Sequence, residues 1–241
     1  VCGKENILFT NNDSAYETAI SLFNKGIKIN AIIDIREKVN SEITNHAEKI
    51  GIKIYNSYTI VDTSGYRRIK EVSIMKLSKD GQSVTGSKIK IKCNCLGISG
   101  GWTPAVHLFT QSGGKLKFDN EDNVFIPSKY PSDQISIGSC NGEFDLNTII
   151  KNFNQNIKNF LGIDKTSFED LKINSTKEIL KRNIWLLPSD KAIGKCKPFV
   201  DFQNDATAKD IKLALREGFR SIEHVTVSYT HLRAHETAYY L

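Results

Sequence analysis

The sequence predicts an α/β fold built on a parallel sheet, because short apolar runs alternate with segments of helical character. The apolar runs cover residues 7–10, 29–34 and 52–54, and the helical segments cover residues 14–25 and 40–50. Gly26 and Gly51 directly follow the two helical segments, where helices commonly end. A strand–helix–strand–helix–strand order implies parallel strands that are joined by right-handed crossovers.

The pattern changes between residues 57 and 92, where apolar and polar residues alternate with a period of two. This spacing predicts an antiparallel ribbon or meander, with a turn at Asp80-Gly81. An antiparallel insertion after the third parallel strand recurs in reductases that bind two dinucleotides. The next expected strand lies in CNCLGISGGWTP, which ends in a Gly-Gly-Trp turn and a proline.

The sequence of the second half of the chain indicates fewer helices and strands. The segment QISIGSCNG is expected to form a short strand and a glycine-flanked turn, followed by a long helix over 146–161. After a connecting segment of mixed charge, a further helix is expected to start near Thr207 and to end at Gly218. Thr207 is a suitable N-cap, and Asp210 stands in the first turn, where the helix dipole favours an anion.

Composition excludes several classes of protein. The 241 residues are 39% hydrophobic and 25% charged, as in ordinary globular proteins. The net charge of +6 is modest and the lysines are scattered along the sequence, so a groove that binds nucleic acid is not indicated. No apolar run approaches the length of roughly 18 residues that a membrane-spanning helix needs. The first residues, VCGKEN, contain neither a starting Met nor a secretion signal, which predicts a piece of a longer chain.

The five cysteines are predicted to be free thiols. They stand at positions 2, 93, 95, 140 and 196 and form no disulfide pattern. Cys93 and Cys95 would share one face of a strand, but a metal site normally needs four ligands, usually with Cys-x-x-Cys spacing. Buried or half-buried thiols of a cytoplasmic protein are therefore expected, with no metal site.

The turn in ILFTNNDSAYETA, residues 7–19, has the position of a phosphate-binding turn but contains no glycine. Glycine lets backbone N–H groups approach a pyrophosphate at a helix N-terminus. Here Asn11, Asn12 and Asp13 take that place, and they adopt left-handed turn conformations less readily. Asp13 would itself occupy the positive end of the helix dipole and compete with a phosphate. A self-capped structural turn is therefore the prediction, with a phosphate cradle as the alternative.

Asp34 ends the second apolar run, where an acid would accept hydrogen bonds from the ribose hydroxyls of NAD. Arg36, two residues further on, could stack on adenine or contact a phosphate. The alternative is that both residues simply end a strand at the solvent edge.

Three stretches together resemble one family. TNNDSAYETA, ISGGWTPAVHLFTQSGGKLKFD and PFVDFQNDATAKDIKLALREGFRSIEHV are similar to parts of the α (large) subunit of the heterotetrameric, tetrahydrofolate-linked sarcosine oxidases. The resemblance covers about residues 1–225. It implies a pyridine nucleotide-disulfide reductase-like fold, of which the upstream dinucleotide half would be missing, followed by a small α+β domain.

The resemblance also implies an activity, which is the oxidation of sarcosine by oxygen with tetrahydrofolate as acceptor of the one-carbon unit. The products would be glycine, hydrogen peroxide and methylenetetrahydrofolate. NAD would be held on this subunit, FAD and a covalent FMN on or with the β subunit, and tetrahydrofolate in a missing C-terminal domain. The partners would be β, γ and δ subunits in the cytoplasm. This segment would supply scaffold and NAD-binding surface and no catalytic residue.

Two groups of candidate NAD-binding residues follow from the resemblance. Ser99, Gly100, Gly101 and Trp102 stand where reductase-like folds cross back to the first nucleotide domain, and the alternative there is a tight turn with a buried Trp. Gly138 and Ser139 correspond to a Gly-Asp motif that binds FAD, with Ser139 in place of the acid. That departure is compatible with a dinucleotide other than FAD. His107, beside apolar residues, is expected to be a core residue.

The expected domain organisation has four parts. Residues 1–161 form the partial Rossmann-like region, 162–184 a linker, 185–225 the small domain and 226–241 a non-native tail. The small domain is similar to two-iron domains, but Asp201-Phe202-Gln203 stands where their Cys-x-Cys pair would be, so no cluster is expected. Two alternatives stay open, namely an NAD(P)H-dependent flavin reductase and a non-catalytic nucleotide-binding assembly module.

Overall fold

The computed structural model describes residues 3–131, 133–162 and 182–227. Most of the predicted linker and of the predicted tail lies outside these residues. The chain divides into two compact units, one made of residues 1–76 and 87–183 and the other of residues 77–86 and 184–241. In the part of the chain that is described, no helix is long and apolar enough to cross a membrane.

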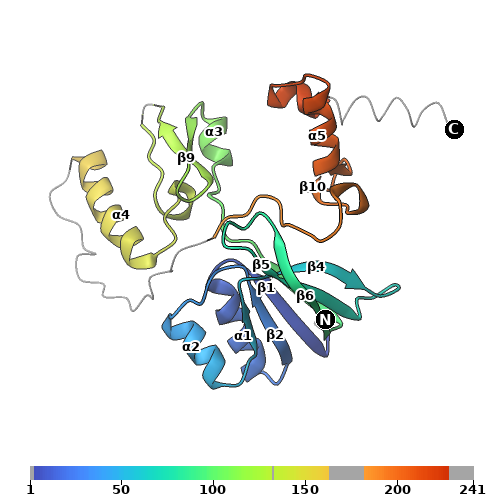
Figure 1. Ribbon diagram of the computed structural model, residues 1–241. Coiled ribbons are helices and arrows are strands. Elements are labelled where there is room, and N and C mark those ends of the chain that lie inside the picture. The colour runs from blue at the N-terminus through green and yellow to red at the C-terminus, as the bar shows by residue number, and fades with distance from the viewer. Residues whose placement is uncertain (1–2, 132, 163–181, 228–241) are drawn as a thin grey trace. The chain divides into compact units, whose positions relative to one another are not determined.

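The first unit contains a four-stranded parallel sheet with two helices packed beside it (Figure 1). Its strands are β3 (Ile54–Asn56), β2 (Lys28–Asp34), β1 (Glu5–Thr10) and β7 (Cys95–Ser99), in this spatial order. All three pairings are parallel, as the sequence predicts. Helices α1 (Ser14–Asn24) and α2 (Glu42–Lys49) connect β1 to β2 and β2 to β3. The predicted α/β fold with a Rossmann-like parallel sheet is therefore confirmed.

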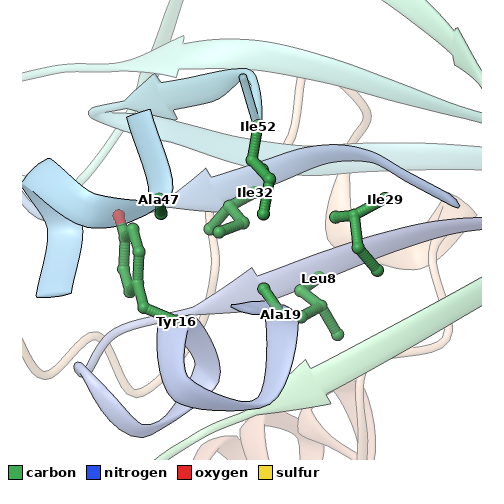
Figure 2. Packing of buried hydrophobic residues seen from close by; sticks show 7 residues of the cluster. All are labelled: Leu8, Tyr16, Ala19, Ile29, Ile32, Ala47 and Ile52. Carbon is green, nitrogen blue, oxygen red and sulfur yellow. The ribbon is translucent and has the colours of Figure 1, made fainter. Parts of the chain in front are cut away.

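The core lies between this sheet and its two helices (Figure 2). Its buried members come from both layers and are Leu8, Tyr16, Ala19, Ile29, Ile32, Ala47 and Ile52. Each large aliphatic side chain that is fully buried stabilises the fold by about 1.5–3 kcal/mol. Gly26 and Gly51, with φ of +78° and +88°, follow the two helices in the left-handed conformation that favours glycine.

The predicted antiparallel insertion is a three-stranded sheet of β4 (Tyr58–Ser64), β5 (Glu71–Leu77) and β6 (Val84–Lys92), in this order. Strands β4 and β5 pair antiparallel. The predicted turn between β5 and β6 is present, because Gly81 has a φ of +71° and its N–H donates to the Ser78 carbonyl over 3.0 Å.

The segment after β7 departs from the prediction. It forms a short helix, α3 (His107–Gln111), and an antiparallel hairpin of β8 (Lys115–Asp119) and β9 (Val124–Lys129), which the sequence pattern did not reveal. The strand expected in QISIG is wrong, because residues 134–137 have no regular structure and lead into the 3-10 helix η1 (Gly138–Asn141). A strand needs a hydrogen-bonded neighbour, which an apolar alternation alone does not supply. The predicted long helix is α4 (Leu146–Leu161).

The second unit contains the 3-10 helix η2 (Ile193–Lys195), the short antiparallel pair β10 (Phe199–Asp201) and β11 (Ala206–Thr207), and helix α5 (Ala208–Arg216). The predicted start of α5 is confirmed, because the backbone N–H and the hydroxyl of Thr207 donate to Asp210 Oδ2 over 2.8 and 2.7 Å. Gly218 follows the helix with a φ of +96°.

Candidate functional site

The carboxyl ends of three neighbouring strands lie side by side at one edge of the parallel sheet. Thr10, the last residue of β1, is paired with Asp34 of β2 on one side and with Ser99 of β7 on the other. From β1 the chain winds to β2 and β3 in one direction, whereas β7 lies on the opposite side of β1. This reversal makes the gap between the ends of β1 and β7 the switch point at which open α/β sheets bind their ligands.

The side chain of Asn12 occupies this switch point. It is 0% exposed, and its Nδ2 donates to Ser99 Oγ over 3.1 Å and to Asn11 Oδ1 over 2.8 Å. Its Oδ1 accepts a hydrogen bond of 3.1 Å from the backbone N–H of Ser14, the first residue of α1. Asn12 thus links the loops after β1 and β7 and satisfies a donor at the start of the helix. The predicted self-capped turn is present, with Asn12 as the capping side chain in place of Asp13.

Asp34 is fully buried and takes part in an ion-pair network. Its carboxylate accepts from the backbone N–H of Arg36 (2.9 Å), from Arg36 Nε (3.1 Å) and Nη2 (2.8 Å), and from the Tyr16 hydroxyl (2.8 Å). Arg36 Nη2 also lies 2.8 Å from Asp13 Oδ1, and the Arg36 side chain is only 3% exposed. The alternative in which Asp34 and Arg36 end the strand at the solvent edge is therefore wrong, because each carries the counter-charge that permits the other to be buried.

The network changes the proton affinity of its members. Burial, followed by the charge and the hydrogen bond of Asp34, raises the pKa of Tyr16 above its ordinary value. For Arg36, burial by itself would lower the pKa, but the hydrogen bonds and charges of Asp34 and Asp13 outweigh it and raise the pKa. Tyr16 therefore stays a neutral hydrogen-bond donor and Arg36 a cation.

Arg182 lies across the same edge of the sheet. Its Nη1 donates to the carbonyl of Ile35 over 2.9 Å, and its own carbonyl accepts from Asn11 Nδ2 over 3.4 Å. The residue thereby joins the loop after β1 to the loop after β2. The sequence had placed it in a linker, and no local pattern around it indicates this contact.

The loop after β7 is more open than the turn after β1. Gly101 has a φ of +100°, and a side chain there would stand 3.8 Å from Asn11 Oδ1. Gly100 is exposed, and a side chain there would meet no other atom within 4 Å. Trp102 is 58% exposed, so the alternative of a tight turn with a buried Trp is wrong. Among the four candidates in this loop, Gly100 and Trp102 are the exposed ones, whereas Ser99 and Gly101 are half-buried.

Gly138 and Ser139 form part of a different surface. They begin η1, where Gly138 is buried with a φ of +78° and Ser139 is exposed. A side chain on Gly138 would meet Ile149 of α4 at 3.5 Å. The N-terminus of α4 is already capped, since Asp145 Oδ2 accepts from the backbone N–H of Thr148 over 2.8 Å. None of the side-chain hydrogen bonds of Asn12 and Asp34 at the sheet edge involves Gly138 or Ser139.

The remaining polar candidates do not form a reactive centre in the described ranges. His107 is exposed at the start of α3, so the expected core position is wrong, and Phe109 fills the core instead. No cluster of three or more metal-ligating side chains occurs among the residues that are described. Asp201 Oδ1 accepts from the backbone N–H of Gln203 over 2.8 Å and so closes the turn between β10 and β11.

The turn after β1 and the end of β2 do not fit the pyrophosphate and the ribose of a dinucleotide. The side-chain amide of Asn12 occupies the place of the glycines. The carboxylate of Asp34, the acid in the ribose position, already accepts hydrogen bonds from Arg36 and Tyr16. The sequence pointed to Asp34 and Arg36 individually. It did not reveal that Tyr16 and Asp13 would join them.

Comparison with known proteins gives consistent matches along the chain. The family model of the sarcosine oxidase A3 domain matches residues 195–234. The sarcosine oxidase subunit alpha of Corynebacterium sp. (strain P-1) is 28% identical over 92% of this chain, and that of Rhizobium meliloti (strain 1021) is 27% identical over 92%. The chain spans only 23% and 21% of the length of these two relatives.

A solved structure supports the fold. The L-proline dehydrogenase from P. horikoshii is similar to 94% of this chain with a TM-score of 0.50 and 14% sequence identity, and 40% of that protein is covered. This likeness concerns the fold alone. In sequence, the chain is similar to proteins named sarcosine oxidase subunit alpha, of whose length it spans less than a quarter.

Proposed function

We propose that the chain is part of the α subunit of a sarcosine oxidase and contributes scaffold and an NAD-binding surface to it. The observation that carries the proposal is the similarity, over 92% of the chain, to proteins named sarcosine oxidase subunit alpha. The activity of the whole protein would be the oxidative demethylation of sarcosine with oxygen and tetrahydrofolate. Its products would be glycine, hydrogen peroxide and methylenetetrahydrofolate.

The proposal assigns no reacting group to this chain. FAD and a covalent FMN would be on or with a β subunit, tetrahydrofolate in another domain of the α subunit, and γ and δ subunits would complete a cytoplasmic heterotetramer. A structural role for this chain is supported by the hydrogen bonds that the polar side chains at the sheet edge make with one another. Asn12 bonds Ser99, and Asp34 bonds Arg36 and Tyr16.

The NAD-binding surface on this chain would be the loop Ser99–Trp102, with Gly138 and Ser139 as a second group. The loop supports the proposal because Gly100 and Trp102 are exposed beside the switch point of the sheet. Trp102 could cover a nicotinamide or adenine ring, and the absence of a side chain at Gly100 lets a ligand approach the backbone. The dinucleotide itself would be held mainly by a part of the subunit beyond this chain.

The test uses the full-length α subunit, co-expressed and purified with its partner subunits. The complex is denatured, and the released nucleotides are identified by chromatography and mass spectrometry. NAD released from the α subunit, with FAD and a covalent flavin on a partner, is the expected result. FAD released from the α subunit alone, together with rapid reduction by NADH, would instead identify a flavin reductase and contradict the proposal.

A substitution locates the surface. Gly100→Trp adds a large side chain in open space, so the fold should persist while the NAD content of the complex falls by about tenfold or more, as expected when contact with the ligand is blocked. Gly194→Trp is the matched control, because a side chain at Gly194 also meets no atom within 4 Å, but this residue belongs to the second unit. Equal NAD content in both variants and the unmodified complex would rule out the loop as an NAD contact.

A further inference from the structure

Two neighbouring strands of the parallel sheet, β1 and β2, each have a buried polar side chain at their carboxyl end. In dinucleotide-binding sheets, the turn after the first strand donates backbone N–H groups to the pyrophosphate, and the acid after the second strand accepts from the ribose. Both positions hold polar side chains here, namely Asn12 and Asp34, and both side chains are 0% exposed. Each of them contacts protein atoms from at least two elements.

The pyrophosphate position is filled from within the protein. Asn12 spans the gap between β1 and β7 through its hydrogen bond to Ser99 Oγ, and its Oδ1 takes the N–H of Ser14 that a phosphate would use. The backbone N–H of Tyr16 is taken as well, by the Asp13 carbonyl over 2.9 Å. A phosphate could enter only if Asn12 left this position and gave up its bonds to both loops.

The ribose position is filled by an ion pair. Both carboxylate oxygens of Asp34 accept from Arg36, and Oδ2 also accepts from Tyr16. Asp13, at the N-cap of α1, contacts with its Oδ1 the same Arg36 Nη2 that bonds Asp34, again at 2.8 Å, so an anionic side chain stands where a phosphate would bind. Arg182 bonds the carbonyl of Ile35 and covers the same edge. The cation that could attract a phosphate is thus already neutralised by two carboxylates.

We infer that the switch-point crevice of this sheet is a closed structural joint that takes no dinucleotide. Its side chains tie the ends of β1, β2 and β7 to the start of α1. NAD that is bound to the subunit, as proposed above, is therefore held outside this crevice and reaches the chain at most through the open loop after β7. The crevice is closed in this way whether or not the subunit binds NAD.

Hydrogen–deuterium exchange on the assembled complex tests the inference without changing the protein. The complex is stripped of nucleotide and compared with and without a large excess of NAD. We expect no change in the exchange of amides 11–16 and 35–36. Protection of these amides by NAD would overturn the inference. Amides 99–103 report separately on the proposed NAD contact, since residue 104 is a proline without an N–H. Unchanged exchange in this loop as well would contradict that proposal and leave the inference about the crevice standing.

A substitution provides a second, independent measurement. Asp34→Asn removes the carboxylate that a bound ribose would need, and NAD affinity of the complex is measured by titration, with the exposed Glu37→Gln as matched control. We expect both variants to bind NAD within about twofold of the unmodified complex, because neither residue contacts NAD. A ribose that is hydrogen-bonded to Asp34 would lose more than roughly tenfold in affinity in Asp34→Asn only, and that result would contradict the inference. Where Asp34→Asn does not assemble, the exchange measurement decides.

Discussion

Replacing Asp34 by Asn is the most informative perturbation of the sheet edge. The carboxylate is 0% exposed and accepts hydrogen bonds from Arg36 and from the Tyr16 hydroxyl. Asn keeps the shape, but it loses the negative charge and presents an NH₂ group to partners that are themselves donors. Removing one partner of a buried ion pair typically costs about 3–5 kcal/mol. We expect the lower end, about 3 kcal/mol, because Asp13 still lies 2.8 Å from the Arg36 guanidinium and compensates its charge.

The free energy of unfolding is measured by urea denaturation of the chain, followed by far-ultraviolet circular dichroism. Glu37→Gln, on the exposed residue beside the network, should change it by less than about 0.5 kcal/mol. A loss below about 1 kcal/mol in Asp34→Asn, which is the size of one ordinary hydrogen bond, would refute the buried ion-pair network.

A second substitution, Arg36→Met, tests the ion-pair network by comparison of its destabilising effect with that of Asp34→Asn. Arg36→Met removes the cation that Asp34 and Asp13 share, and it leaves two carboxylates in a buried site. It should therefore be more destabilising than Asp34→Asn, which leaves one cation beside one remaining carboxylate. The reverse order in the same urea experiment would show that the charges are compensated from elsewhere.

Three further outcomes are expected. Folding raises the pKa of Tyr16, so the stability that its proton contributes is present below the unfolded pKa near 10 and is lost as the pH rises above that value. Tyr16→Phe should therefore reduce the decline of the free energy of unfolding at alkaline pH, as measured by urea denaturation. An unchanged decline would contradict the burial of the hydroxyl. Burial raises the pKa of the Cys93 thiol, so iodoacetamide should modify Cys93 more slowly than Cys95 in the folded chain. Mass spectrometry follows the two modification rates, and equal rates would argue against the burial of Cys93. Asp210→Ala removes the acceptor of both Thr207 hydrogen bonds and should lower stability by about 1 kcal/mol in urea denaturation, whereas no loss would mean that the cap contributes nothing.

Local patterns in the sequence determined the elements of the parallel sheet and their ends. Apolar runs and helical spacing predicted β1, α1 and β2, and Gly26 and Gly51 marked the helix ends because glycine reaches a positive φ without a steric cost. The alternation over 57–92 likewise predicted the antiparallel sheet. Such signals lie within a window of a few residues, so they can be interpreted without knowledge of the partners.

The partners of the polar side chains were decided only by the tertiary structure. Asp34 has the position of a ribose-binding acid in the sequence, but the fold brings Tyr16 and Asp13 from the preceding strand–helix unit beside it, and Arg36 turns back to bind both carboxylates. The contact of Arg182 with Ile35 joins positions far apart in the chain. A buried charge is stable only when a counter-charge and hydrogen bonds surround it, and these come from whichever segments meet at the edge of the sheet. The residue types at this edge are therefore readable from the sequence, whereas their use as a closed joint depends on the folding of the whole unit.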